Sequence, residues 1–171
     1  MAFQLAQVNI ARPREPLDSE LLAEFVASLD PVNAVADGTP GFVWRLQAED
    51  GNATSVPVFE DDGLIVNMSV WESLEALRAF VYSTPAHLAV MRRRREWFER
   101  MEVHMALWWV PAGHIPTVAE AEERLTLMSA IGPSPDAFTF RRHFPPALEL
   151  QICRSADLQF RSSFAEQTLE Q

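Results

Sequence analysis

Residues 105–110 read Met105-Ala106-Leu107-Trp108-Trp109-Val110, a run of apolar residues with no polar position. Successive side chains of a β-strand point to opposite faces of the sheet, so Trp108 and Trp109 must lie on opposite faces. The segments 42–44 and 64–66 are apolar throughout in the same way. Antiparallel sheets commonly leave one face in water. The sequence instead predicts an antiparallel sheet that is covered on both faces.

Helices are predicted between these strands. Residues 3–10 alternate with period two and predict a first strand. A first helix is predicted after Asp18, which can cap it, and Pro31 is predicted either to end it or to start a short turn. Further strands are predicted at 42–46, 64–68, 104–110 and 138–144. Three further helices are predicted. The first begins at a capping box at Ser69–Glu72 and runs to Ser83, the second runs from Pro85 to about Met101, and the third from Thr117 to Gly132.

This order predicts an α+β fold, a ferredoxin-like βαββαβ unit with an antiparallel sheet and an extra C-terminal helix and strand. No spare helix is expected over the second face of the sheet, so a symmetric copy is predicted to cover it, giving a homodimer through the sheet faces. One domain is predicted over residues 1–146. Residues 147–171 are predicted to be a tail with at most one short strand.

Composition excludes several functions. The net charge is −10, which disfavours nucleic acid as a partner. The chain has no lysine, so neither a Schiff-base lysine nor the lysine of a P-loop is available. Cys153 is the only cysteine, which fits a reducing compartment. No apolar stretch approaches the length of a membrane span. We therefore expect a cytoplasmic protein with no membrane partner.

Several long motifs resemble a bacterial family known as domain of unknown function 3291. They are Pro40–Leu46, Val66–Ser73, Met91–Phe98 and Trp108–His114, and the resemblance ends near Pro146. The family is similar to the dimeric α/β-barrel superfamily, which implies a homodimer and a pocket between sheet and helices. The superfamily includes cofactor-independent monooxygenases, haem-degrading enzymes and small isomerases. The resemblance itself implies no single reaction.

Candidate ligand-binding residues follow from polar groups in apolar surroundings. Asn67 interrupts an apolar strand, where an unbonded amide is costly, so it is predicted either to bond a neighbouring loop or to orient a ligand oxygen. Arg94 and Arg95 fall between Met91 and Phe98 on the stripe that should face the core. At least one guanidinium is therefore predicted to be partly buried, against a carboxylate or a ligand anion.

Tryptophans and a histidine complete the candidate pocket. The tryptophans Trp44, Trp71, Trp97 and Trp108 suit a flat hydrophobic or aromatic ligand, although such side chains are more often core. His87 lies near the start of a helix, where bonding to the backbone is the commoner role. In haem-binding relatives of the superfamily the proximal histidine comes from this connection, so the resemblance implies His87 as the axial ligand if haem binds. No metal-ligand motif is found in the sequence.

Three hypotheses remain open at this stage. The first is a small-molecule-binding protein, which as an enzyme would resemble a cofactor-independent monooxygenase or an isomerase, with no cofactor. The second is a haem-binding protein ligated by His87. The third is a non-catalytic binding or scaffold module, in which the same residues serve packing only.

Overall fold

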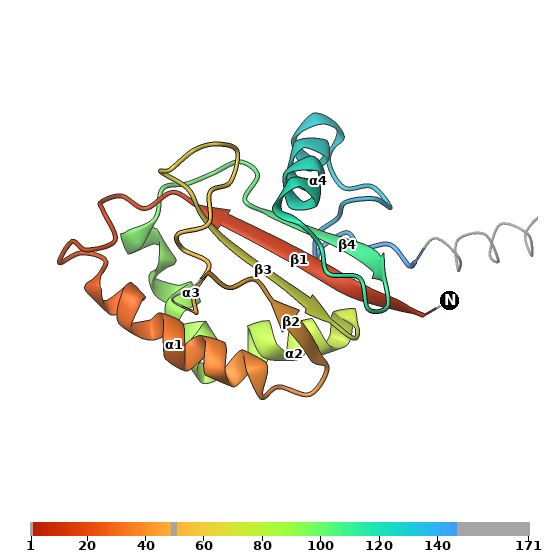
Figure 1. Ribbon diagram of the computed structural model, residues 1–171, viewed down its shortest axis with the longest axis horizontal. Helices are drawn as coiled ribbons and strands as arrows, with labels where there is room; N and C mark the ends of the chain where they lie inside the picture. Colours follow the sequence, from red (N-terminus) through yellow and green to blue (C-terminus); the bar gives the residue numbers. More distant parts are fainter. Residues whose placement is uncertain (1, 49–50, 147–171) are drawn as a thin grey trace, which may run out of the picture.

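The computed structural model describes residues 2–48 and 51–146, arranged around a four-stranded antiparallel sheet (Figure 1). The strands are β1 (Phe3–Ala11), β2 (Phe42–Arg45), β3 (Ile65–Trp71) and β4 (Met105–Pro111). The helices are α1 (Ala23–Asp37), α2 (Leu74–Ser83), α3 (Pro85–Trp97) and α4 (Val118–Ile131). The strand order is β2-β3-β1-β4, and α2 with α3 forms the second connection. This is the ferredoxin-like α+β topology that the order of elements predicted.

The central strand β1 pairs with β3 on one side and with β4 on the other, and this pairing sets rows of side chains across the sheet. Leu5 lies opposite both Trp71 and Trp109. Two residues further on, Gln7 lies opposite Ser69 and Leu107. Asn9 then lies opposite Asn67 and Met105. Because side chains alternate along a strand, these three rows share one face.

Helices α1, α2 and α3 cover the face that carries these rows. A first apolar cluster packs around Leu5, Trp71 and Leu107, with Leu77 and Phe80 of α2 against it. A second cluster contains Phe25 of α1 and Trp97 of α3, and Ile65 of β3 packs against it. The two clusters therefore meet the sheet at opposite ends of β3.

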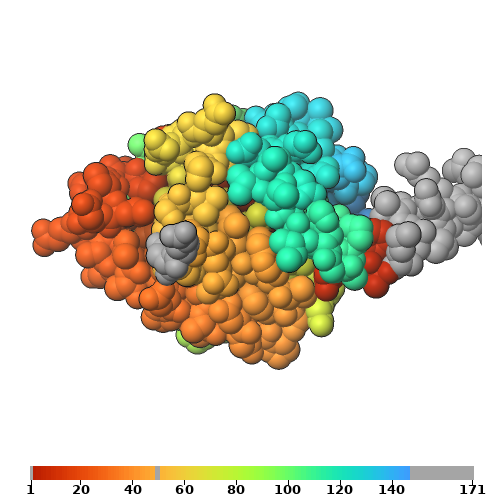
Figure 2. All heavy atoms as spheres, in the orientation of Figure 1, coloured from red at the N-terminus to blue at the C-terminus, as the bar shows by residue number. Residues whose placement is uncertain are grey.

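The second face of the sheet is covered within the same chain. Its side chains include Val8, Met68 and Trp108, each at most 2% exposed. They pack in one cluster with Leu125 of α4 and with residues of the segment 51–64. Figure 2 shows the segment 51–64 in yellow beside α4 in cyan, with little of β1 visible. The prediction that both faces are buried is confirmed.

The prediction that only a symmetric copy of the sheet could cover the second face is therefore wrong. No spare helix was expected over the second face, yet α4 and the segment 51–64 occupy it. Trp108 and Trp109 do lie on opposite faces, as predicted. Trp108 packs with α4 on the second face, and Trp109 packs against the first apolar cluster on the face that α1, α2 and α3 cover. Neither tryptophan is left for a partner sheet. Homodimerisation itself stays a prediction.

Two helix boundaries differ from those predicted. Pro31 lies inside α1, which continues to Asp37. A proline at position 31 leaves the carbonyl of Ala27 unpaired, and Ala27 is exposed, so water can replace the lost bond. The capping box at Ser69–Glu72 is not used, because Ser69 and Trp71 belong to β3 and pair with β1. The helix begins four residues later, where Ser73 accepts a hydrogen bond from the Ala76 N–H at 3.1 Å.

The C-terminal elements are partly as predicted. The capping box at Thr117 is confirmed, since its hydroxyl accepts from the Glu120 N–H at 3.2 Å while Glu120 accepts from the Thr117 N–H at 2.6 Å. The strand predicted at 138–144 does not form. Only Phe138 bridges to Leu107 of β4, and the chain then leaves the sheet edge. The predicted tail, 147–171, lies outside the described residues.

The segment 51–64 contains a strained turn. Val58 and Asp61 bridge across it, and its central residues Phe59 and Glu60 have φ of 53° and 52°. Turns with two positive φ values favour glycine or asparagine because a Cβ is costly there. The Phe59 N–H donates to Glu122 of α4 at 2.6 Å, so the turn is tied to the helix beside it.

Replacing Glu60 with glycine is expected to stabilise the protein. Glycine adopts positive φ without the Cβ clash, and the net gain after its larger unfolded-state entropy is roughly 0.5–1 kcal/mol. Urea denaturation measures the change. Glu60→Ala removes the same charge but keeps a Cβ, so it should show no gain; equal stabilisation by both variants would contradict this account.

Candidate functional site

Between the two apolar clusters, the helical face of the sheet carries four polar side chains. They are Gln7 and Asn9 of β1 and Asn67 and Ser69 of β3, and we call them the polar band. The sheet register places them in two adjacent rows. On a face otherwise packed against helices, such a band is the natural place for polar contacts to a ligand.

Hydrogen bonds link the amides of the polar band. The Gln7 Nε2 donates to Asn67 Oδ1 at 2.7 Å, and the Asn9 Nδ2 donates to Gln7 Oε1. Ser69 does not bond to these amides; its hydroxyl accepts a hydrogen bond from the Trp71 indole Nε1 at 2.9 Å. The band is therefore held by its own contacts.

The polar band is open at one end. Gln7 is 5% exposed and Ser69 is 7% exposed, so the helices cover that row. In the next row Asn9 and Met105 are half-buried, and Asn67 is exposed because β2 pairs with β3 only as far as Ser69 and leaves the edge of β3 open beyond it. Solvent therefore reaches the sheet between the helices at Asn67, which is the geometry a ligand needs.

The backbone of His104 lies beside this end of the polar band, in register with Ile10 of the second face, and the charge of Arg94 is close to the His104 imidazole. The carbonyl of His104 accepts from the Ile10 N–H at 2.9 Å, next to Asn9. Burial and the nearby charge of Arg94 both lower the pKa of His104. The side chain of Arg94 is exposed and has a carboxylate neither as hydrogen-bond nor as ion-pair partner among the described residues. The prediction that Arg94 or Arg95 is partly buried is wrong, because both are exposed on α3.

His87 makes a structural contact through one ring nitrogen. Its Nδ1 lies 3.0 Å from the carbonyl of Val81, so Nδ1 carries the proton and Nε2 keeps its lone pair. The imidazole also lies against Phe80, at 5.0 Å between ring centroids. Burial lowers the pKa of His87, partly opposed by the bond to Val81. The histidine is therefore neutral at neutral pH.

This lowered pKa predicts loss of stability on acidification. The unfolded chain takes up the proton near the ordinary pKa of 6.5, whereas folded His87 resists it, so stability is present above that value and lost as pH falls through the lowered pKa. Melting temperatures between about pH 8 and pH 5 measure the effect. His87→Gln should reduce the slope, and the exposed His143→Gln should not. An unchanged slope in the His87 variant would contradict the assignment.

The predicted tryptophans belong to the cores. Trp71 is 1% exposed, stacks on Phe80 at 5.2 Å and meets Phe42 edge-on at 5.3 Å. Trp97 lies in the second apolar cluster, and the guanidinium carbon of Arg93 lies 4.8 Å from the centroid of its ring. The remaining pair, Trp44 and Trp108, packs on the second face. The structure thus does not bring the candidate tryptophans together around one pocket.

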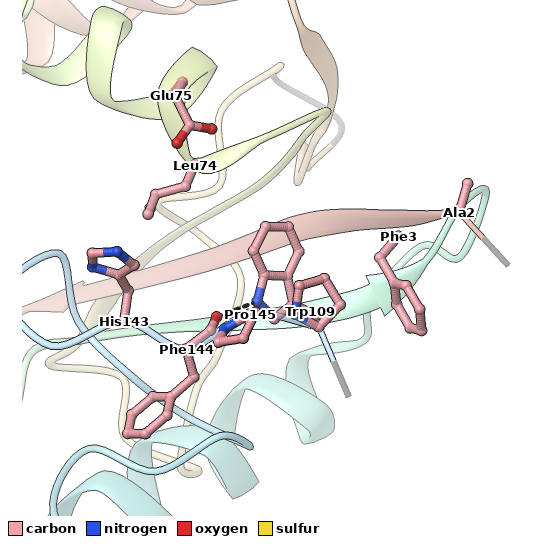
Figure 3. Close-up of a pocket in the computed structure, with 9 residues that line it drawn as sticks. Ala2, Phe3, Leu74, Glu75, Trp109, His143, Phe144 and Pro145 are labelled. Carbon is pink, nitrogen blue, oxygen red and sulfur yellow. Dashed lines mark hydrogen bonds between the residues drawn. The ribbon is translucent and has the colours of Figure 1, made fainter. Parts of the chain in front are cut away.

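A pocket of about 580 Å³ lies elsewhere on the helical side, beside the start of α2 (Figure 3). Its wall includes Leu74, Trp109 and Pro145, and the Trp109 Nε1 donates to the Phe144 carbonyl at 2.7 Å. The carboxylate of Glu75 and the imidazole of His143 are its two titratable side chains. None of the residues predicted as ligand-binding lines this pocket.

The alternative that His87 ligates haem stays a prediction. The His87 ring packs on Phe80, which itself stacks on Trp71. The 580 Å³ pocket does not include His87. Within the described ranges, no group of three or more metal-ligating side chains occurs. No step through haem is derived for this chain.

Two members of the polar band were not predicted. Gln7 and Asn9 lie on β1, whose alternation was recognised but whose polar positions were assigned no role. The available signal was that Gln7 and Asn9 follow Leu5 on one face of the strand, whereas Ala6, Val8 and Ile10 on the other face are apolar. Their contact with Asn67 depends on the register of β1 against β3, which the sequence does not state.

The fold and the polar band together define an α+β protein of ferredoxin-like topology with an open polar site on the helical face of its sheet. The family described as domain of unknown function (DUF3291) matches residues 4–153, and the chain belongs to this family. The match continues past Pro146, where the resemblance was expected to end. No curated protein matches the chain.

Solved structures share the general arrangement. The cofactor-independent oxygenase SnoaB from Streptomyces nogalater is 19% identical, covers 67% of this chain and 97% of its own, and has a TM-score of 0.44. A putative antibiotic biosynthesis monooxygenase from Chloroflexus aurantiacus is 19% identical, with coverages of 66% and 97% and a TM-score of 0.44. A conserved protein from Methanosarcina mazei is 9% identical, with coverages of 63% and 91% and a TM-score of 0.46. At these TM-scores we draw no functional conclusion from them.

No helix within the described part of the chain is long and apolar enough to cross a membrane.

Proposed function

We propose that this protein binds a flat, hydrophobic small molecule over the open end of the polar band, with Asn67 in contact with the ligand. The observation that carries the proposal is the exposure of Asn67 beyond the end of β2, where the helical face of the sheet is open between two apolar clusters. Apolar walls with a few convergent polar groups are the usual composition of ligand sites.

The groups around the polar band suit a reaction that uses no cofactor. Amides can bond an oxygen of the ligand, and Arg94 can stabilise a developing negative charge. Both roles stabilise the enolate that forms when a proton is removed next to a carbonyl, a first step that isomerases and cofactor-independent monooxygenases can share. We place the chain in this class. A dimer through the sheet faces is not part of the proposal, because α4 already occupies that face.

Thermal stabilisation by a panel of aromatic ketones, quinones and phenols tests the binding site. Asn67→Ala should weaken binding of any ligand that stabilises the wild type by about tenfold, the value of one lost hydrogen bond. Glu75→Ala, which alters the 580 Å³ pocket and leaves the polar band intact, should bind normally. The reverse pattern would place the ligand in that pocket and overturn the proposal.

Catalysis is tested separately with the ligands that bind. Oxygen consumption with a hydroxylated or quinone product indicates a monooxygenase, and proton exchange or isomerisation without oxygen uptake indicates an isomerase. Neither activity, with binding intact, would leave a binding protein and remove the enzyme part of the proposal.

A further inference from the structure

The 580 Å³ pocket beside the start of α2 is separate from the polar band. Its wall includes Phe3 at the beginning of β1, whereas the polar band begins at Gln7 of the same strand, and the buried Leu5 lies between them. The volume falls in the usual range for small-molecule sites, roughly 300–1,000 Å³. The ligand proposed for the polar band leaves this pocket unused.

Aromatic and apolar side chains form most of the pocket wall. In Figure 3 the Trp109 ring lies at the centre, with Pro145 beside it and Phe3 further along the sheet. The hydrogen bond from the Trp109 Nε1 to the Phe144 carbonyl holds the indole in place. Trp109 is only half-buried, so part of its ring is open to a ligand. Indole is the aromatic side chain that attracts cations most strongly.

Glu75 supplies negative charge at the same pocket. Its carboxylate and the His143 ring lie on different sides of the space that the Trp109 ring borders (Figure 3). Among the residues that the structure describes, the Glu75 carboxylate has neither a hydrogen-bond nor an ion-pair partner. Its charge is therefore available to a ligand.

The arginines near the pocket do not neutralise Glu75 by direct contact. Arg78, one turn further along α2, donates to the Phe140 carbonyl at 2.8 Å. The guanidinium carbon of Arg142 lies 5.7 Å from the centroid of the Phe144 ring. Neither arginine lines the pocket. The net charge of −10 on the chain also favours a cationic over an anionic ligand.

We propose that this pocket binds an organic ammonium ion with a flat apolar body. The ammonium group lies between the Glu75 carboxylate and the Trp109 ring, and the body packs along Phe3 and Pro145. A carboxylate and an indole face both attract a cation, whereas a neutral ligand of the same shape gains neither contribution. The inference is independent of the proposed function, because the pocket and the polar band share no residue.

Calorimetric titration of the whole chain with tryptamine and with tryptophol tests the ligand class. The two probes share an indole body and differ in an ammonium group against a hydroxyl. The wild type should bind tryptamine about tenfold more tightly, from one ion pair and one cation–π contact together. Equal affinities for the two probes, or no binding of tryptamine at millimolar concentration, would overturn the proposal.

Glu75→Gln removes the charge and keeps the size of the side chain. It should weaken tryptamine binding about fivefold and leave tryptophol binding unchanged. Glu72→Gln is the matched control, since Glu72 is exposed three residues earlier and does not line the pocket. An equal loss in both variants would indicate general attraction to an acidic surface and remove the site. Asn67→Ala should bind tryptamine normally, so this inference and the proposed function can fail separately.

The indole N–H resonances in NMR spectra report where tryptamine binds. Addition of tryptamine should shift the Trp109 resonance and leave those of the buried Trp71 and Trp108 in place. The shift should need a higher tryptamine concentration in Glu75→Gln than in Glu72→Gln. Tryptamine that binds without moving the Trp109 resonance lies elsewhere on the protein, and the proposal is then wrong.

Discussion

Replacement of Trp108 with aspartate is expected to leave no folded protein. Trp108 is 2% exposed and packs with α4 on the second face of the sheet. Removing a buried tryptophan side chain costs about 3–5 kcal/mol, and the buried, unpaired carboxylate that replaces it adds several more. The sum reaches the total stability of an ordinary domain, about 5–15 kcal/mol. Circular dichroism and solubility of the expressed variant measure the outcome.

Two controls separate this expectation from an interface role. Trp108→Phe keeps most of the packing and removes an indole N–H that has no hydrogen-bond partner among the described residues, so it should fold. Ile131→Asp places the same charge at a site of α4 that is 67% exposed and should change stability little. A folded, soluble monomeric Trp108→Asp, beside a wild type that is dimeric in light scattering, would contradict the packing described and support the dimer through the sheet faces.

Replacement of Trp71 with alanine is expected to destabilise the protein by about 3–5 kcal/mol. Its ring stacks on Phe80 and meets Phe42 edge-on, so its loss leaves a cavity in the first apolar cluster. Chemical denaturation of the purified variant gives the free energy of unfolding. The effect follows from Trp71 being a core residue and not part of a ligand pocket.

Trp71→Phe provides the comparison, because it keeps an aromatic ring in the cluster and loses chiefly the bond to Ser69. Its cost should be well below that of the alanine variant. A Trp71→Ala protein that is as stable as the wild type but no longer binds ligand would contradict this assignment and show that Trp71 contacts the ligand.

The sequence predicts the fold well where local patterns decide it. Alternation placed Trp108 and Trp109 on opposite faces, and the Thr117 capping box placed the start of α4. The predictions failed where tertiary contacts outweigh local signals. Ser69 resembles a helix cap, yet pairing of β3 with β1 keeps it in the strand. No local pattern indicates that α4 folds back over the sheet.

The site was predicted less completely. Asn67 stood out because a polar residue in an apolar strand is conspicuous, and the structure leaves it exposed; its role in ligand binding stays a prediction. The arginines and tryptophans were chosen as candidates for their size and number. In the structure Arg94 and Arg95 are exposed on α3, and the tryptophans pack in the apolar clusters. Gln7 and Asn9 became meaningful only through the strand register, which depends on contacts distant in the chain.

The polar band also has a consequence for how the chain folds. If β1 slipped by one residue against its neighbours, Gln7 and Asn9 would enter the sealed side under α4, and Ala6 and Val8 would face the opening. Burying two amides without partners costs more than any packing such a slip could retain. The residues that we propose to recognise a ligand therefore also select the correct strand alignment, so substitutions that abolish binding can also permit misfolded registers.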